Sequence, residues 1–337
     1  MIRRTLAAIV IVATALLLLV IAWPQLFGAA QLPILAQLVS LRAAAASVGL
    51  GIVALLVVVA LVAAPVRRFA ASMAAIGLVF CLVNLAVLST RGFGNTTFAA
   101  ATDNDVTVLS WNTLGDLPGA DTIAQLAIEA GADIVVLPET SRAAGEAVAT
   151  IMGEAGLAMV AHTSSYDEIS KARSTTLLIS ADLGDYTVDE GARTTTVLPS
   201  VIAIPADGTG PTIIAVHPVA PIPGEMDHWR QDLRWVRDAC AGGNVIMAGD
   251  FNSTMDHFAG LATAPNAAIG ECLDAAVATD NAAVGTWPSA APALLGAPID
   301  HVMATANWRA TGMRVIETQD DAGSDHRPIV AQLTPAG

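Results

Sequence analysis

The sequence predicts an anchor of three membrane-spanning helices followed by one α/β domain built in layers. Residues 1–91 contain no Asp, Glu or Lys, although the whole chain is 54% hydrophobic and only 14% charged. The remaining 246 residues hold all 30 acidic residues and ten of the 16 basic ones, a formal charge of −20. In this second part, short β-type runs alternate with amphipathic helical runs, as is typical of α/β layers. The composition therefore indicates lipid around the first part and water around the second.

Three apolar segments are long enough to cross a bilayer, which takes about 20 residues of helix. They cover Thr5–Phe27, Ala43–Ala64 and Phe69–Thr90. A cleaved signal peptide is the alternative for the first segment, but its apolar run is too long and two further spans follow it. Residues 65–68 form a tight turn, so the second and third spans are expected to form an antiparallel hairpin. Asn84, within the third span, is expected to bond to a neighbouring helix and to have no catalytic role.

The arginines beside these spans predict the orientation of the chain. One side of the membrane receives Arg3, Arg4, Arg67 and Arg68, and the other receives Arg42 and Arg91. Because positive loops remain in the cytoplasm, the N-terminus is expected inside. Three spans then make this a multi-pass protein of the cell membrane, with its domain outside the cytoplasm. There, Cys240 and Cys272 could pair, although two separate buried thiols are at least as good an interpretation.

The predicted organisation is an anchor of residues 1–91, a small polar linker of residues 92–104 and a domain of residues 105–337. About 245 residues after the anchor are ample for one large domain with a core. The expected strands are Val106–Ser110, Ile134–Leu137, Thr175–Ser180, Ser200–Ile204, Ile213–Val216, Val245–Ala248, His301–Ala304 and Ile329–Leu333. The expected helices are Asp121–Ala130, with Asp121 as its N-cap, Ala143–Ala155 and Asp227–Cys240.

Acidic, amide and imidazole side chains recur where the expected strands begin or end. They are Asn112, Glu139, His217, Asp250 with Asn252, Asp300 with His301, and Asp325 with His326. Taken singly, each has an ordinary explanation, such as a turn residue, a solvated carboxylate or a core histidine. Six such coincidences in one domain favour a functional site, because strand ends hold side chains rigidly while loops give access.

These stretches resemble the endonuclease/exonuclease/phosphatase superfamily, which includes DNase I-like nucleases, neutral sphingomyelinases and inositol-polyphosphate phosphatases. In the family's order, the matching stretches are Ser110-Trp111-Asn112, Ile134–Glu139, Val216-His217, Gly249-Asp250-Phe251-Asn252, Ile299–Val302 and Gly323–Pro328. The resemblance spans Val106 to Leu333, essentially the whole domain. It implies a DNase I-like, four-layered α-β-β-α sandwich with the site at one end of two packed sheets.

The resemblance also implies a metal site. Glu139 would be the principal ligand of Mg²⁺, and Mn²⁺ could replace that ion. Asn112 and Asp325 would complete or support the site. Hard oxygen ligands suit Mg²⁺, which keeps several waters for substrate oxygens to displace.

The catalytic roles are likewise implied by the resemblance. Asp250 would orient or deprotonate the attacking water, and Asn252 would hold a phosphate oxygen. His326 would act on the phosphoryl group as an acid/base or charge stabiliser, and Asp300 would fix its tautomer and raise its pKa. His217 matches the second histidine of the DNase I-like and sphingomyelinase-like members.

The expected function is hydrolysis of a phosphoester by in-line attack of a water, in a membrane-anchored phosphodiesterase or phosphatase. A lipid-linked substrate is attractive because tethering raises the effective concentration of membrane-bound substrates. The first alternative is an extracytoplasmic nuclease, which the charge of −20 disfavours because nucleic acid is a polyanion. The second is a catalytically silent binding domain, which ranks last because the expected catalytic residues are all present.

Two further stretches have open interpretations. The segment Lys171–Ser174 either supplies basic contacts near the site or is a solvated loop. The segment Thr286–Pro288 either lines a substrate pocket or contributes a buried packing tryptophan.

Overall fold

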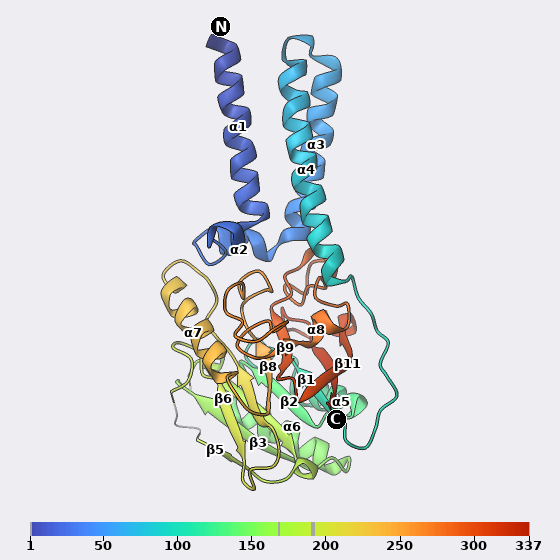
Figure 1. The fold of residues 1–337 in the computed structure, drawn as a ribbon. Helices are drawn as coiled ribbons and strands as arrows, with labels where there is room; N and C mark the ends of the chain where they lie inside the picture. The colour runs from blue at the N-terminus through green and yellow to red at the C-terminus, as the bar shows by residue number, and fades with distance from the viewer. Residues whose placement is uncertain (1, 168, 190–192, 337) are drawn as a thin grey trace. The chain divides into compact units, whose positions relative to one another are not determined.

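The structure is a computed structural model that describes residues 2–167, 169–189 and 193–336. The chain forms two compact units, Met1–Thr90 and Arg91–Gly337 (Figure 1). Residues 92–104, expected to be a linker, therefore fall within the second unit. There the Gly94 N–H donates to the carbonyl of Asp280 at 2.9 Å.

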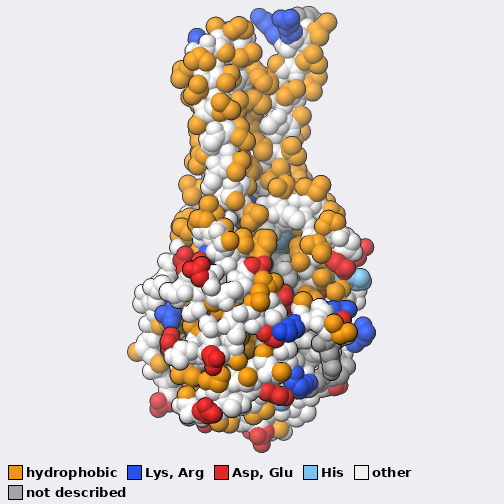
Figure 2. All heavy atoms as spheres, turned by 180° about the vertical axis from the view of Figure 1, so that it is seen from behind, with side chains coloured by type: hydrophobic (Ala, Val, Ile, Leu, Met, Phe, Trp, Pro, Cys, Tyr) orange, Lys and Arg blue, Asp and Glu red, His pale blue; other side chains and the backbone are white. Residues whose placement is uncertain are grey.

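Three helices in the described part of the first unit are long and apolar enough to cross a membrane. These spans comprise α1 (Ile2–Ala22), α3 (Arg42–Val62) and the segment Ala64–Arg91, which contains α4 (Arg67–Arg91). Among the coloured side chains on the visible surface of these helices in Figure 2, hydrophobic ones predominate, and basic side chains lie at the far end. The first helix ends before the expected boundary at Phe27, because Trp23 precedes Pro24 and a residue before proline disfavours the α conformation. A short helix, α2 (Leu35–Ser40), lies in the connection to α3.

A buried arginine connects the three long helices. Arg42, only 4% exposed, donates to the carbonyl of Ala22 and to Oδ1 of Asn84, both at 2.8 Å. The Asn84 amide in turn donates to the Phe80 carbonyl at 2.9 Å. The expectation that Asn84 bonds to another helix is confirmed, and its partner on that helix is the charged side chain of Arg42.

Over the described residues, the second unit contains two six-stranded sheets. The first has the order β11 (Trp308–Val315), β12 (Ile329–Pro335), β1 (Val106–Ser110), β2 (Ile134–Pro138), β4 (Ser174–Ser180) and β3 (Met159–Ser165). The second has the order β5 (Tyr186–Val188), β6 (Val201–Pro205), β7 (Thr212–Val216), β8 (Val245–Asp250), β10 (Asp300–Ala304) and β9 (Leu273–Asp274). The sequence did not predict β3, β5, β9 and β11, and these four are the edge strands of the two sheets.

The two sheets pack face to face and helices cover their outer faces, so the predicted four-layered sandwich is confirmed. The core between the sheets includes Val108 and Val136 from the first sheet and Ile213 and Ile246 from the second. The outer face of the first sheet packs against α5 (Ala120–Ala130) and α6 (Arg142–Glu154). Helix α7 (Met226–Ala239) supplies the fourth layer, and its Trp229 donates to the Ser253 hydroxyl, beyond the end of β8 (Figure 1). A one-turn helix, α8 (Ala275–Ala278), follows β9.

The start of α5 differs from the prediction. Its N-cap is Gly119, and no side chain caps the helix there. Asp121 lies inside the first turn, so its prediction as the N-cap is wrong. Its carboxylate still lies near the positive end of the helix dipole, which accounts for the acidic residue at this position.

Strand direction brings the ends of distant segments together. In the first sheet, β1 runs parallel to β2 and antiparallel to β12. In the second sheet, β8 runs parallel to β7 and antiparallel to β10. The carboxyl ends of β1, β2, β7 and β8 therefore meet the amino ends of β12 and β10. The six polar stretches found in the sequence all occur at these ends.

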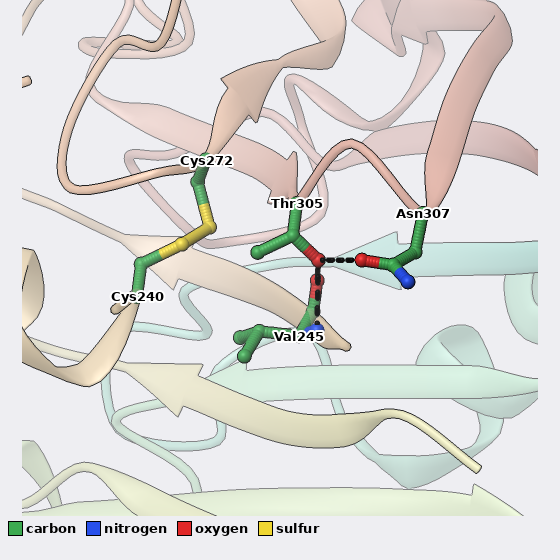
Figure 3. The surroundings of a disulfide bond; sticks show 5 residues. All are labelled: Cys240, Val245, Cys272, Thr305 and Asn307. Carbon is green, nitrogen blue, oxygen red and sulfur yellow. Dashed lines mark hydrogen bonds between the residues drawn. A yellow bond between two sulfur atoms is a disulfide. The ribbon is translucent and has the colours of Figure 1, made fainter. Parts of the chain in front are cut away.

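A disulfide joins Cys240 and Cys272, which are 32 residues apart in the chain (Figure 3). Their Cα atoms are 6.0 Å apart, within the usual range for a disulfide. Cys240 ends α7 and Cys272 precedes β9, so the bond connects the outer helix layer to the edge of the second sheet. The alternative of two separate thiols does not hold in this structure.

Candidate active site

Asn112 and Glu139 follow the neighbouring parallel strands β1 and β2, and their side chains meet at the end of the first sheet. The Asn112 Nδ2 donates to Glu139 Oε1 at 3.1 Å and to Asp250 Oδ2 at 3.0 Å. Its Oδ1 accepts from the Leu114 N–H at 3.0 Å. The amide thus connects a carboxylate of each sheet. With its oxygen already bonded, it suits support of Glu139 better than direct binding of an ion.

Glu139 occupies a constrained turn directly after β2. Its backbone φ is 58°, a left-handed conformation that is uncommon for residues other than glycine. The Thr113 hydroxyl donates to its carbonyl at 3.0 Å. Burial raises the pKa of the Glu139 carboxyl against the Asn112 hydrogen bond and the charge of His326, while Asp325 adds to the rise. Glu139 is therefore a partly buried carboxylate whose negative charge is incompletely balanced.

Asp250 ends β8 and is almost fully buried. Its Oδ1 accepts from the Asn252 N–H at 2.8 Å, and its Oδ2 accepts from the Asn252 side chain at 3.2 Å. The Asn252 side chain also donates to the carbonyl of Pro218, at 3.0 Å. Burial raises the pKa of Asp250 to about 7. The residue before it must be glycine, because Gly249 has a φ of 145° and a Cβ there would overlap with the carbonyl oxygen of Val216.

His326 lies between two carboxylates of the second sheet. Its Nδ1 is 2.9 Å from Asp300 Oδ2, and its Nε2 is 3.7 Å from Asp250 Oδ2. Burial opposes the charged imidazolium, but the carboxylates of Asp300 and Asp250 outweigh it and raise the pKa of His326 to about 10. At neutral pH His326 is therefore a cation that donates Nδ1–H to Asp300 and presents Nε2–H toward Asp250.

His217 has the opposite character. The Thr175 hydroxyl oxygen lies 2.6 Å from the Pro199 carbonyl and 3.2 Å from His217 Nδ1. Because a carbonyl only accepts, the hydroxyl donates to Pro199 and the histidine donates its Nδ1–H to Thr175. Nε2 is then an unprotonated acceptor that has no hydrogen-bond partner among the described residues. Burial and the charge of His326 lower the pKa of His217 to about 3, so it is neutral.

Asp325 directly precedes His326 and contacts a tryptophan. Its Oδ2 accepts from Trp287 Nε1 at 2.9 Å. Its Oδ1 is buried and lacks a partner in the part of the chain that the structure describes. Trp287, left open between pocket lining and packing, thus contacts a predicted site residue. The adjacent Thr286 accepts from the N–H groups of Ile299 and Asp300, at 3.1 and 3.2 Å.

The donor set fits a divalent cation that is bound through oxygen. Glu139 and Asp325 are close enough to raise the pKa of Glu139 by repulsion, and the Asp325 Oδ1 is an unpaired buried acceptor. Asp250, Asp300 and His326 form a second group, with ligand atoms within 4.8 Å of one another. We favour the first group, because the His326 imidazolium would repel a cation placed between Asp250 and Asp300.

The structure brings all predicted site residues to one end of the two sheets. Direct contacts join Asn112, Glu139, Asp250, Asn252, His326 and Asp300, and charge interactions add Asp325 and His217. Four supporting residues were not predicted from the sequence: Thr113, Asp116, Thr175 and, as the partner of Asp325, Trp287. Thr175 and Trp287 lie near their partners only after folding. Thr113 and Asp116 follow Asn112 closely in the chain, and that proximity was a usable signal.

The profile of the Endonuclease/Exonuclease/phosphatase family matches residues 109–326. A humanized D. rerio TDP2 carrying 14 mutations shares 17% sequence identity and a TM-score of 0.52, over 69% of this chain and 100% of its own. An endonuclease/exonuclease/phosphatase from Beutenbergia cavernae shares 18% identity and a TM-score of 0.51, over 69% of this chain and 72% of its own. No curated protein matches the chain.

At such low identity the solved structures show a common fold and nothing finer. The profile match is the stronger finding, because it covers more than half of the chain and extends from the last residues of β1 to His326. The chain therefore belongs to the endonuclease/exonuclease/phosphatase family.

Proposed function

We propose that the protein is a membrane-anchored, Mg²⁺-dependent phosphodiesterase or phosphatase that attacks its substrate with a water. Hydrolysis of phosphoester or nucleic acid substrates is the activity of its family. This more specific proposal rests on the side chains that surround the Asp250 carboxylate. This buried carboxylate lies 3.0 Å from the Asn112 amide and 3.7 Å from the His326 imidazolium, with Asp300 behind the imidazolium at 2.9 Å.

In this proposal each side chain does a separate task. Asp250, whose pKa of about 7 makes it a stronger base than an ordinary carboxylate, accepts the proton of the attacking water. The His326 cation, held by Asp300, stabilises the charge that develops on the phosphoryl oxygens and gives its Nε2 proton to the leaving oxygen as the ester P–O bond breaks. Asn252 exchanges one of its two side-chain hydrogen bonds, to Asp250 or to Pro218, for a hydrogen bond to a phosphoryl oxygen, and neutral His217 accepts a hydrogen bond at Nε2.

The cation proposed beside Glu139 and Asp325 would neutralise charge on the phosphoryl group. Those two carboxylates would hold the ion, and the Asn112 amide would hold Glu139 in place. Mn²⁺ would occupy the same oxygen ligands. Members of the family generally use a divalent metal, which agrees with the incompletely balanced carboxylates here.

We further propose that the second unit lies outside the cytoplasm. The disulfide between Cys240 and Cys272 supports this location, because disulfides persist in oxidising compartments and are rare in the cytosol. The distribution of arginines beside the predicted spans also favours a location outside the cytoplasm. A lipid-linked phosphoester is the preferred substrate, because anchoring concentrates the enzyme on membrane-bound molecules.

A nuclease is the second candidate. One similar structure, of D. rerio TDP2, is a complex with a single-strand DNA product, at 17% identity and a TM-score of 0.52. The formal charge of −20 after residue 91 opposes association with a polyanion. We rank a silent binding domain below both, since Glu139, Asp250 and His326 are all retained.

The full chain in detergent micelles provides the test. Hydrolysis of bis(p-nitrophenyl) phosphate, a panel of phospholipids and plasmid DNA is measured with Mg²⁺ and with EDTA. Asp250→Asn and His326→Gln are compared with the exposed controls Asp207→Asn and His228→Gln. We expect activity only with metal and only in the unmodified and control proteins. Activity that survives EDTA or both site substitutions would refute the mechanism, and preference for DNA would favour the nuclease.

A further inference from the structure

We infer that Asp116 is a positioning residue that holds the turn carrying Glu139, and that it thereby sets the affinity for a divalent cation. The inference rests on the proposed function, because it concerns the metal that this function requires. Asp116 lies in the loop after β1, four residues beyond Asn112, and belongs to none of the recognised stretches. Its contacts connect three segments at the site end of the first sheet.

The carboxylate of Asp116 binds the turn after β2 at two points. Oδ1 accepts from the Ser141 N–H at 2.8 Å, and Oδ2 accepts from the Ser141 hydroxyl at 2.7 Å. Ser141 is the N-cap of α6 and lies two residues after Glu139. Asp116 therefore holds Ser141, at the end of the turn that begins with the constrained backbone of Glu139.

The backbone of the loop that contains Asp116 also contacts the start of this turn, through Thr113. The Asp116 N–H donates to the Thr113 hydroxyl oxygen at 3.1 Å. That hydroxyl lies 3.0 Å from the Glu139 carbonyl and 2.8 Å from the Thr140 hydroxyl. Contacts with Asp116, direct or through Thr113, thus involve all three consecutive residues from 139 to 141.

A third segment completes the arrangement. Lys171 Nζ lies 3.0 Å from Asp116 Oδ2, and this lysine precedes β4. The side chain of Lys171 is half exposed, whereas that of Asp116 is mostly buried. The lysine therefore balances charge at the solvent side, while the hydrogen bonds to Ser141 provide the geometry. This contact gives a defined role to one basic residue of the segment Lys171–Ser174.

Glu139 adopts a left-handed φ of 58°, and such a conformation persists only where the surroundings over-determine it. Asp116 itself has a φ of 68°. Loss of its carboxylate would release the turn, and the Glu139 carboxylate would then have to be ordered by the ion. Residues that orient a metal ligand typically change metal affinity by about 10- to 100-fold when they are replaced.

The test compares Asp116→Ala with the matched control Asp207→Ala in the full chain. Asp207 accepts from the N–H and the hydroxyl of Thr209, at 2.9 and 2.8 Å, in an exposed turn between β6 and β7. It has the same pair of bonds away from the site end of its sheet. Calorimetry measures the Kd for Mg²⁺, and the rise in Tm that Mg²⁺ produces provides a readout that needs no turnover.

We expect Asp116→Ala to raise the Kd for Mg²⁺ at least about tenfold, with kcat largely recovered at saturating Mg²⁺. Asp207→Ala should change the Kd less than twofold. A folded Asp116→Ala protein with unchanged Mg²⁺ affinity and only a lower Tm would overturn the inference and leave Asp116 as a helix-capping partner. If Asp116→Ala does not fold, Ser141→Ala and Asp116→Asn are measured in the same way, and unchanged affinity in both has the same meaning. Absence of Mg²⁺ binding by the unmodified protein would instead overturn the proposed function, and this inference with it.

Discussion

Replacement of His217 by glutamine is expected to remove part of the pH dependence of folding stability. In the folded protein burial and the charge of His326 lower the pKa of His217 to about 3. In the unfolded chain an unhindered histidine has a pKa of about 6.5. Above the pKa of His217 in the unfolded chain, this histidine is neutral in both the folded and the unfolded protein. Its protonation then does not change the free energy of unfolding. As the pH falls below about 6.5, the unfolded chain gains a proton that the folded protein does not, so stability is lost.

The magnitude follows from the difference between the two pKa values. Each pH unit between them is worth about 1.4 kcal/mol. Between pH 7.5 and pH 5, the protonation of unfolded His217 should therefore lower the free energy of unfolding by about 2 kcal/mol. Glutamine does not titrate, so His217→Gln should show a pH-dependent loss smaller by that amount. Any constant cost of the substitution cancels in the comparison of the two pH values.

Denaturant unfolding of the full chain in detergent at pH 7.5 and pH 5 measures this difference. His228→Gln is the control, because His228 is exposed and its pKa is raised through its hydrogen bond to Glu225. That substitution should not make the pH-dependent loss smaller, because a pKa that is raised by folding favours the folded state as the pH falls. If His217→Gln and the unmodified protein lose the same free energy of unfolding, His217 is not the neutral histidine described here. The tautomer assigned from Thr175 would then be wrong as well.

Asp250→Asn should lower kcat by about 10²- to 10⁴-fold, measured by phosphoester hydrolysis, because a base is lost and its volume is kept; thermal unfolding checks that the variant is folded, and an active variant would exclude Asp250 as the base. Conversion of Cys240 and Cys272 together to serine should lower the free energy of unfolding by about 3 to 4 kcal/mol, because the bond closes a loop between residues 32 apart in the chain. Denaturant unfolding with and without reductant measures this loss, and an unaffected stability would mean that the bond does not form. Arg42→Met should destabilise the helices of the anchor by about 2 kcal/mol or more in detergent, because the Oδ1 of Asn84 loses a charged donor; a stability equal to that of the unmodified protein would contradict the bridging role of Arg42.

The strands at the centre of each sheet could be predicted because they are buried on both faces. Their sequences contain apolar runs, such as Ile134–Leu137, and these runs fall within the observed strands. The four missed strands are all at sheet edges, where one side of the strand faces solvent. Polar and charged residues are tolerated there, as in β3 and β11, and the apolar pattern is lost.

The candidate site was predictable to the extent that its residues lie at strand ends. Asp250 and Asn252 could be recognised together because two residues of separation place both in one turn, where the Asn252 N–H caps the Asp250 carboxylate at 2.8 Å. Thr175 could not be recognised, because a threonine inside a strand has no distinguishing pattern. Its contact with His217 depends on the packing of one sheet against the other. The indole of Trp287 likewise donates to Asp325, although 38 residues separate the two in the chain.

The sequence by itself determined the apolar spans, the chemical types of the site residues and their order along the chain, since these follow from local composition and spacing. Only the tertiary structure decided which groups touch: the pairing of Cys240 with Cys272, the position of His326 between two carboxylates, and the attachment of Asp116 to the turn of Glu139. The physical reason is that hydrogen bonds and charge interactions act over a few ångströms. Strand direction and sheet packing, rather than proximity in the chain, bring such groups within that distance.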